Sequence, residues 1–308
     1  MSALDRVLTG LGAHPVLMEV GAAVRPNEVW DAVARHSVYV GVGPETTTLS
    51  PSLHGSFHRL SLIEDVVTPE ACRVATFHET CDRVYSTVLE PNAPETTPYL
   101  DGQSWSEHMR LATATTITSL LKRLSLDRLD WLHTNANGID VELFRSIEQP
   151  VRSRILALDT VFDLVHLWTG PGSQVTSYQE LVAEGFWLTR LSSHGFVRIQ
   201  PKSVQQLEVL DRGLSRVHLG DRLRVAPGWM FARFLRTLES LLSVSSSRVD
   251  YATLWAFAIV DDQLGYAADV AFQYRRIFGE DEHCKTMVEE TVRRIRSRVD
   301  RRTKTGSD

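Results

Sequence analysis

Residues 129–144 have the sequence LDWLHTNANGIDVELF, an apolar run that ends in a polar turn and leads into a helical pattern. This order predicts a buried strand, a turn and the start of a helix. Ligands bind open α/β sheets just beyond the carboxyl ends of the strands. The His, Asn, Gly and Asp residues at this strand end therefore mark a candidate site.

The segment upstream predicts a βαβ unit over residues 15–45. Residues 15–20 (PVLMEV) form an apolar run that ends in GAA, and residues 38–42 (VYVGV) form a second β-rich run that ends in GPE. Between these runs, Pro26 suits a first helical position. The side chains expected to face the sheet are Val29, Trp30 and Val33. An amphipathic helix over residues 1–12 precedes the unit.

Further strands and helices alternate downstream as far as about residue 203. Residues 80–104 are polar and rich in Pro and Thr, which favours a long binding loop or lid. The strands are expected near residues 57–62, 73–78, 112–117 and 154–159, the last ending on Asp159. Helices are expected at 119–126 and 177–184, and an antiparallel pair at 186–191 with 195–199.

From about residue 203 the pattern becomes helical, with a period of 3.6 residues over residues 204–214, 229–242, 249–265 and 267–278. Alternating strands and helices followed by helices alone predict an α/β domain with a parallel sheet over residues 1–202 and an all-helical C-terminal extension over residues 203–308. The arginine-rich tail at 293–304 is expected to be a solvated helix face, and an anionic partner is the alternative.

The composition excludes several classes of protein. The 308 residues carry a net charge of −5, which gives no indication of nucleic-acid binding. Three scattered cysteines argue against a disulfide scaffold or a structural zinc site, and the histidines lack metal-ligand spacing. No apolar run approaches the ~20 residues of a membrane span, and no signal peptide is apparent. A cytoplasmic protein without a metal is expected, and homo-oligomerisation is left open.

The first strand end carries Glu19, Gly21 and Ala22. An acid followed by glycine at such a position suits a nucleotide or nucleoside ligand, because glycine lets the backbone approach and the acid holds a polar group. An ordinary strand-to-helix turn is the alternative. Glu45, after the second strand and Gly43, is placed to pair with ribose hydroxyls, or else is an exposed turn residue. No full dinucleotide-binding glycine motif is present.

Three residues of the opening segment are candidates for chemistry. His133 and Asn135 point to the same face of a strand, since side chains alternate with a period of two. His133 suits a general base near neutral pH, although a hydrogen-bonded structural histidine is the alternative. Asp140 begins the next helix and either orients a ligand or favours the helix N-terminus.

Taken in order, these elements resemble the FkbM-type family of S-adenosylmethionine-dependent methyltransferases. The resemblance spans roughly residues 15–280. It rests on the EVGA strand end at 19–22, VGPE at 42–45, YSTVLEPN at 85–92, the opening segment, LALD at 156–159, EGFWL at 184–188 and PGW at 227–229.

The resemblance implies a Rossmann-like class I methyltransferase sheet of seven strands and an O-methyltransferase that acts on a hydroxyl of a sugar, glycan or related natural product. It implies that Glu19, Gly21, Ala22, Gly43 and Glu45 contact S-adenosylmethionine. His133 would be the base, and Asn135, Asp140 and Asp159 would orient the acceptor.

The chain departs from the family pattern at functional positions. The family's lysine falls on His133, its aspartate on Asn135 and its ribose-binding glutamate on Gly43. These changes motivate an alternative function, a catalytically degenerate methyltransferase fold that acts as a binding or scaffold subunit. A third alternative, a nucleotide-sugar enzyme, lacks a phosphate-binding glycine loop.

Overall fold

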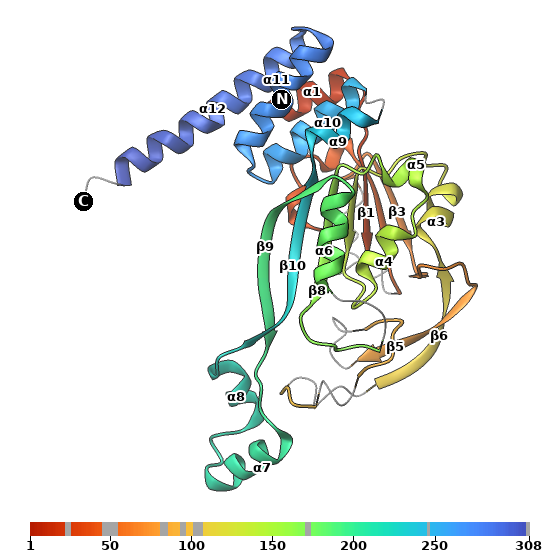
Figure 1. The fold of residues 1–308 in the computed structure, drawn as a ribbon, viewed down its shortest axis with the longest axis vertical. Helices are drawn as coiled ribbons and strands as arrows, with labels where there is room; N and C mark the ends of the chain where they lie inside the picture. Colours follow the sequence, from red (N-terminus) through yellow and green to blue (C-terminus); the bar gives the residue numbers. More distant parts are fainter. Residues whose placement is uncertain are drawn as a thin grey trace.

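The computed structural model describes residues 1–21, 26–44, 55–80, 86–92, 97–100, 107–169, 174–244 and 247–305. Within these residues, seven strands form a central, mostly parallel sheet (Figure 1). In spatial order the strands are β3 (Arg59–Ile63), β2 (Val38–Val42), β1 (Val16–Val20), β7 (Trp131–Thr134), β8 (Ala157–Asp163), β10 (Ala226–Arg236) and β9 (Phe186–Phe196).

The chain order of these strands explains where a ligand site is expected. β1 pairs in parallel with β2 on one side and with β7 on the other, so the chain leaves β1 in one direction and later returns on its opposite side. Such a switch point opens a crevice at the carboxyl ends of the strands. β10 is antiparallel to both neighbours, β8 and β9, and the other pairs in the sheet are parallel.

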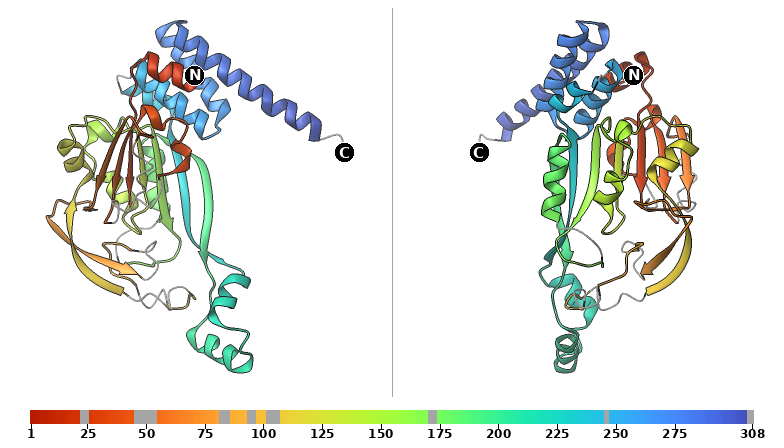
Figure 2. Two further views of the ribbon diagram at one scale, coloured as in Figure 1. Left: turned by 180° about the vertical axis from the view of Figure 1, so that it is seen from behind. Right: turned by 45° about the vertical axis from the view of Figure 1, so that its right-hand side comes forward.

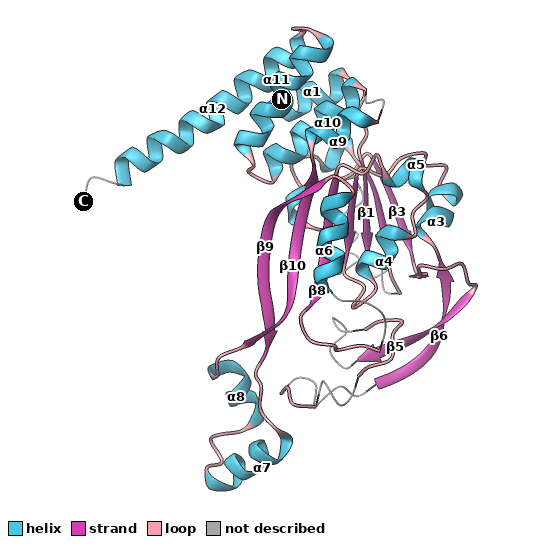
Figure 3. Cartoon of the chain, in the orientation of Figure 1, coloured by secondary structure: helices cyan, strands magenta, loops and turns pink. Residues whose placement is uncertain are grey.

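One face of the sheet packs against helices from the middle of the chain (Figure 3). Val, Met, Leu and Phe side chains from β1, β2, β7 and β8 form the core on this side. The helices are α3 (Ile117–Arg123), α4 (Asp140–Arg145), α5 (Gln149–Arg152) and α6 (Gln174–Ala183). A second sheet extends below the carboxyl edge and consists of β4 (Val66–Val67), β6 (Glu107–Thr115) and β5 (Val74–Thr80).

The other face packs against the N-terminal helix and the C-terminal bundle, which share a core with it. Leu17, Trp131 and Leu235 from the sheet contribute to this core. The helices are α1 (Ala3–Gly10), the 3₁₀ turns η1 (Glu28–Trp30) and η2 (Ala34–His36), α9 (Leu238–Ser243), α10 (Arg248–Val260), α11 (Leu264–Phe278) and α12 (Glu282–Thr305). Two further helices, α7 (Pro201–Leu210) and α8 (Arg216–Arg222), lie at the end of the β9–β10 arm (Figure 2).

Several expectations from the sequence are confirmed. The N-terminal helix, the strands at 16–20 and 38–42 and the strand of the opening segment are all present, and the first two strands are parallel. Trp30 and Val33 are fully buried and face the sheet, as expected. The connection there contains two 3₁₀ turns, and Pro26 precedes the cap residue Asn27 and so lies outside the first of them.

The expected antiparallel pair at 186–191 and 195–199 is wrong. Residues 186–196 form one strand, β9, which pairs with β10. Gly195 does not turn the chain: a Cβ there would lie 1.9 Å from the carbonyl oxygen of Ala226, so glycine permits the close approach of the two strands.

The expected helix at 229–242 is also wrong, because β10 occupies residues 226–236 and α9 begins at Leu238. Phe234 and Leu235 point to opposite faces of the sheet and are both fully buried, so β10 lacks the alternation that marks a half-buried strand. The C-terminal third is therefore not all-helical from residue 203. It supplies one strand of the central sheet before the bundle begins.

Candidate functional site

The ends of β1 and β7 meet tightly at the switch point. The amide of Gly21 donates to the carbonyl of Val42 at 2.9 Å, and the amide of Asn135 donates to the carbonyl of Val20 at 3.0 Å. Gly21 has a φ of +77°, and a Cβ there would lie 2.1 Å from the carbonyl oxygen of Asn135. Gly21 and Asn135, both expected at the site, therefore lie together, and only glycine fits the first position.

A row of polar and charged side chains crosses the sheet just below this edge. Strand register places Glu19 of β1 beside His133 of β7, His133 beside Asp159 of β8, and Asp159 beside Arg233 of β10. We call Glu19, His133, Asp159 and Arg233 the charged row. Glu19, Asp159 and Arg233 are buried, and the His133 side chain is 12% exposed.

Asp159 is the centre of this row. Arg233 binds it with two nitrogens, Nε to Oδ1 at 2.6 Å and Nη2 to Oδ2 at 3.0 Å, and pairs with Asp261 at the end of α10 at 2.9 Å. His133 Nδ1 lies 3.2 Å from Oδ2 of Asp159. A two-pronged arginine–carboxylate pair has fixed geometry, so Asp159 holds the imidazole in one orientation. Asp159 was expected at the end of its strand, but β8 continues to Asp163.

The electrostatics of the row favour the charged forms of its two central groups, His133 and Asp159. Burial by itself would lower the pKa of His133, but the hydrogen bond to Asp159 and the charges of Glu19 and Asp159 outweigh it and raise the pKa above 6.5. Burial would raise the pKa of Asp159, yet Arg233 and His133 hold it below its ordinary value. An imidazole with a raised pKa is a stronger base once it has lost its proton.

Glu19 is held differently from Asp159. The hydroxyl of Tyr39 donates to its Oε2 at 2.8 Å, and burial raises the pKa of its carboxyl despite the nearby His133. Gly41 makes this contact possible, because a Cβ there would lie 2.9 Å from the Tyr39 ring. Glu19 therefore lies on the same face of the sheet as His133.

Asn27 and Trp30 cover the charged row from the segment that follows β1. The side-chain amide of Asn27 donates to Oδ2 of Asp159 at 3.2 Å and lies 3.4 Å from Nδ1 of His133. Its Oδ1 accepts the amide of Val29 and caps the first 3₁₀ turn. The ring of Trp30 packs edge-on against His133 at 6.2 Å. These contacts place Asn27 and Trp30 against the imidazole of His133.

Asp140 has a role in the turn rather than in the charged row. Its Oδ1 accepts the amide of Ala136 at 3.0 Å, which closes the loop between β7 and α4. Burial raises the pKa of its carboxyl, and burial together with the charge of Asp140 raises the pKa of Asp163 to about 7. Asp163, which the sequence did not single out, therefore titrates near neutral pH at the same edge.

The long polar loop contacts the turn after β7. The hydroxyl of Thr87 donates to the carbonyl of Asn137 at 2.8 Å, and the side chain of Asn137 donates to the carbonyl of Ser86 at 3.0 Å. Gly138 has a φ of +100°, and a Cβ there would meet Trp168 and Leu89 at under 3 Å. Residues 86–92 thus fix the shape of the predicted site turn.

The remaining predicted residues contribute less. Gly43 is buried, and its amide donates to the carbonyl of Ile63 at 3.0 Å, which continues the β2–β3 pairing. Ala22 and Glu45, both predicted to bind the cofactor, lie outside the described residues.

The sequence missed Arg233 and Asn27. Arg233 lies in the segment predicted as a helix, so nothing in the sequence indicated that it pairs with Asp159. Asn27 follows a proline and precedes Glu28, a pattern typical of a cap, but its contact with β8 is long-range.

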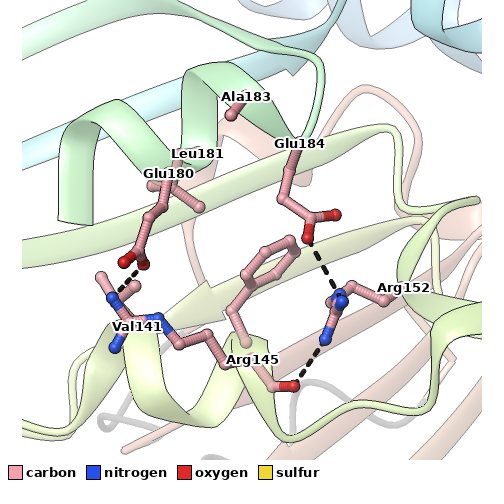
Figure 4. Close-up of a pocket in the computed structure, with 8 residues that line it drawn as sticks. Val141, Arg145, Arg152, Glu180, Leu181, Ala183 and Glu184 are labelled. Carbon is pink, nitrogen blue, oxygen red and sulfur yellow. Dashed lines mark hydrogen bonds and ion pairs between the residues drawn. The ribbon is translucent and has the colours of Figure 1, made fainter. Parts of the chain in front are cut away.

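A groove of about 400 Å³ lies away from this edge, between α4, α5 and α6 (Figure 4). Its charges pair with each other, Arg145 with Glu180 and Arg152 with Glu184. Phe144 forms part of its wall. None of the predicted site residues lines it, and its charges are compensated, so we do not assign the site to this groove.

Comparison with protein-family models, with curated proteins and with solved structures gives no match to this chain. Within the described ranges, no three or more His, Cys, Asp or Glu residues are placed to hold a metal ion. Among the same residues, no helix is long and apolar enough to cross a membrane.

Proposed function

We propose that this protein is an S-adenosylmethionine-dependent O-methyltransferase that acts on a hydroxyl of a sugar, glycan or related natural product. The observation that carries the proposal is the Asp159–His133 pair at the switch point of the sheet, beside Gly21 and Glu19. The mostly parallel sheet of seven strands is compatible with the Rossmann-like sheet that the resemblance implies.

The residues at this edge fit the chemical groups of the cofactor. S-adenosylmethionine has a positively charged sulfonium and an ammonium group, and Glu19 offers a buried carboxylate on this face. Gly21 keeps side-chain bulk away from the turn. Glu19, Gly21 and Gly43, with Ala22 and Glu45, would hold the cofactor, which supplies an electrophilic methyl group when bound.

The chain's own residues would position the acceptor and take its proton. Asp159 fixes the imidazole through Nδ1, which leaves Nε2 of His133 to accept the proton of the acceptor hydroxyl. Asn135 and Asp140 would orient the acceptor at the turn. Because the pKa of His133 is raised, turnover should increase with pH until the imidazole is neutral.

Calorimetric titration with S-adenosylmethionine and with S-adenosylhomocysteine tests the proposal. We expect both to bind, and His133→Ala to retain binding while losing formation of S-adenosylhomocysteine with hydroxyl acceptors. Removing a general base costs about 10²–10⁴-fold in rate. A fully active His133→Ala variant would remove His133 from the mechanism.

A second candidate is a degenerate methyltransferase fold that acts as a binding or scaffold subunit. The hydrogen bonds of Asp159 favour this candidate. Its two oxygens already accept hydrogen bonds from Arg233, His133 and Asn27, so the carboxylate already has partners within the protein. Absence of binding of either cofactor form at millimolar concentration would support this candidate and exclude the enzyme.

A further inference from the structure

The arm formed by β9 and β10 carries an apolar and basic tip far from the candidate site. The two strands run past the sheet and end in α7 and α8, at the opposite end of the longest axis from the helical bundle (Figure 1, Figure 2). We define the tip as residues 198–225. Val204 and Leu219 of the tip form a small core with Val197 and Leu100, which lie at its base.

Large apolar side chains remain outside this core. Val209 is 86% exposed, Leu210 82% and Val217 71%. The first two are the most exposed of the large apolar residues that the structure describes. Leu214, Leu223 and Val225 are exposed as well. Several exposed apolar side chains on one small projection favour a docking site there.

The tip is also basic, in contrast to the rest of the chain. It contains six basic residues against three acidic ones, a formal charge of +3, in a chain of net charge −5. The exposed basic residues of the tip are Lys202, Arg212, Arg222 and Arg224. This charge complements an anionic surface.

The base of the arm is fixed to the body, so the tip is held out rather than folded back. The amide of Leu100 donates to the carbonyl of Val197 at 2.8 Å, and the amide of Ile199 donates to the carbonyl of Pro98 at 2.9 Å. The guanidinium of Arg198 stacks on Tyr99 at 5.5 Å. The 97–100 segment thus braces the arm where it leaves the body.

We propose that the tip docks peripherally on an anionic lipid surface, with Val209 and Leu210 entering the interface and the arginines contacting the headgroups. A lipid surface requires no complementary groove, which suits the end of a projecting arm. Two tips with the same positive charge would repel each other, which disfavours tip-to-tip pairing of two copies. This inference does not depend on the proposed enzymatic function.

Vesicle co-sedimentation of the full chain tests this proposal. We expect binding to vesicles of equal parts phosphatidylcholine and phosphatidylserine, little binding to phosphatidylcholine alone, and weaker binding as salt is added. The double variant Val209→Asp/Leu210→Asp should lose about tenfold in affinity per side chain that no longer inserts. Arg222→Glu and Arg224→Glu should each lose about fivefold.

Matched variants away from the tip serve as controls. Leu111→Asp changes a leucine that is 75% exposed on β6, and Arg276→Glu changes an exposed arginine on α11. Both should bind vesicles as the wild type does, and all variants should retain the wild-type circular dichroism spectrum.

Three results would overturn the proposal. They are no binding to either kind of vesicle, equal losses in the tip and control variants, and self-association in analytical ultracentrifugation that Val209→Asp/Leu210→Asp abolishes. The last would assign the tip to a second copy of the chain.

Discussion

Two rows of side chains lie next to each other on one face of the central sheet, two residues apart along each strand, and they are stabilised in different ways. The apolar row consists of Tyr39, Leu17, Trp131, Ala157 and Leu235. The charged row is the next one toward the carboxyl edge. The first row packs against α10, where Phe257 contacts Trp131 with ring centroids 4.7 Å apart.

The apolar row needs only close neighbours, but the charged row needs specific partners. Arg233 requires Asp159 and Asp261, and Glu19 requires the hydroxyl of Tyr39. Buried charges lose hydration, and pairing often only offsets that loss. Such a row therefore adds little net stability by its pairing alone, and perturbed titratable groups at the carboxyl edge of a sheet favour a functional site.

The largest expected effect comes from breaking the charged row at its centre. Asp159→Ala would leave the Arg233 guanidinium buried with only Asp261 as its partner, and we expect a loss of about 3–5 kcal/mol in the free energy of unfolding. Urea denaturation measures it. Arg190→Ala, an exposed arginine in register with Arg233, is the control and should change stability by less than about 0.5 kcal/mol. Equal effects of the two variants would contradict the assigned role of Asp159.

A smaller effect is expected from closing the space between β1 and β7. Gly21→Ala combines a positive φ with a contact of 2.1 Å to backbone, and should cost about 3 kcal/mol. Gly12→Ala also has a positive φ, +59°, but nothing lies within 4 Å of its Cβ, so it should cost only about 1 kcal/mol. Both variants carry the cost of a positive φ, so the difference between their losses in thermal unfolding measures the cost of the steric clash at Gly21. Equal losses of stability in the two variants would show that the close contact between Gly21 and the backbone of Asn135 leaves room for a methyl group.

Local patterns predicted the first half of the sheet well. The apolar runs at β1, β2 and β7 are short, bounded by glycine or polar turns, and buried on both faces, so length and flanking residues identified them. The acid–Val–Gly pattern at Glu19 also marked the edge where the charged row lies. These features depend on neighbours in the chain, which a sequence displays directly.

The second half depended on contacts between distant segments. β10 has apolar residues on both faces, and its run of aromatic and aliphatic side chains fits a helix as well as a strand. Pairing with β8 and β9 decides between them, and that pairing joins residues at least 30 positions apart. The pairing of β10 with β8 is what brings Arg233 beside Asp159.

The two rows should also differ in their response to pH. The folded pKa of His133 is raised above 6.5, so its contribution to stability is complete below pH 6.5 and is lost as the pH rises through the folded value. The folded pKa of Asp159 is lowered, so its contribution is present above its ordinary 3.8 and is lost as the pH falls through the folded value. The pair therefore contributes most between these two ordinary values.

Denaturation of the wild type and of His133→Asn from pH 3.8 into the alkaline range measures the effect. The difference in unfolding free energy should shrink at alkaline pH. Leu17→Ala, in the apolar row, should give a difference that does not vary with pH over the same range. If the difference in unfolding free energy between the wild type and His133→Asn grew toward alkaline pH, the folded pKa of His133 would be lowered and not raised.

The smallest effect is expected from changing Asn27, which lies over the charged row. Asn27→Ala removes both the cap on the 3₁₀ turn and the donor to Asp159, and should cost about 1 kcal/mol. Asn27→Ser keeps a capping oxygen, so it should recover about half of that loss while still lacking the donor. Because Asn27 and His133 share Oδ2 of Asp159, Asn27→Ser should raise the pKa of His133 in an NMR titration. A lowered pKa of His133 would mean that Asn27 stabilises the protonated imidazole, and that it does not compete with His133 for Oδ2 of Asp159.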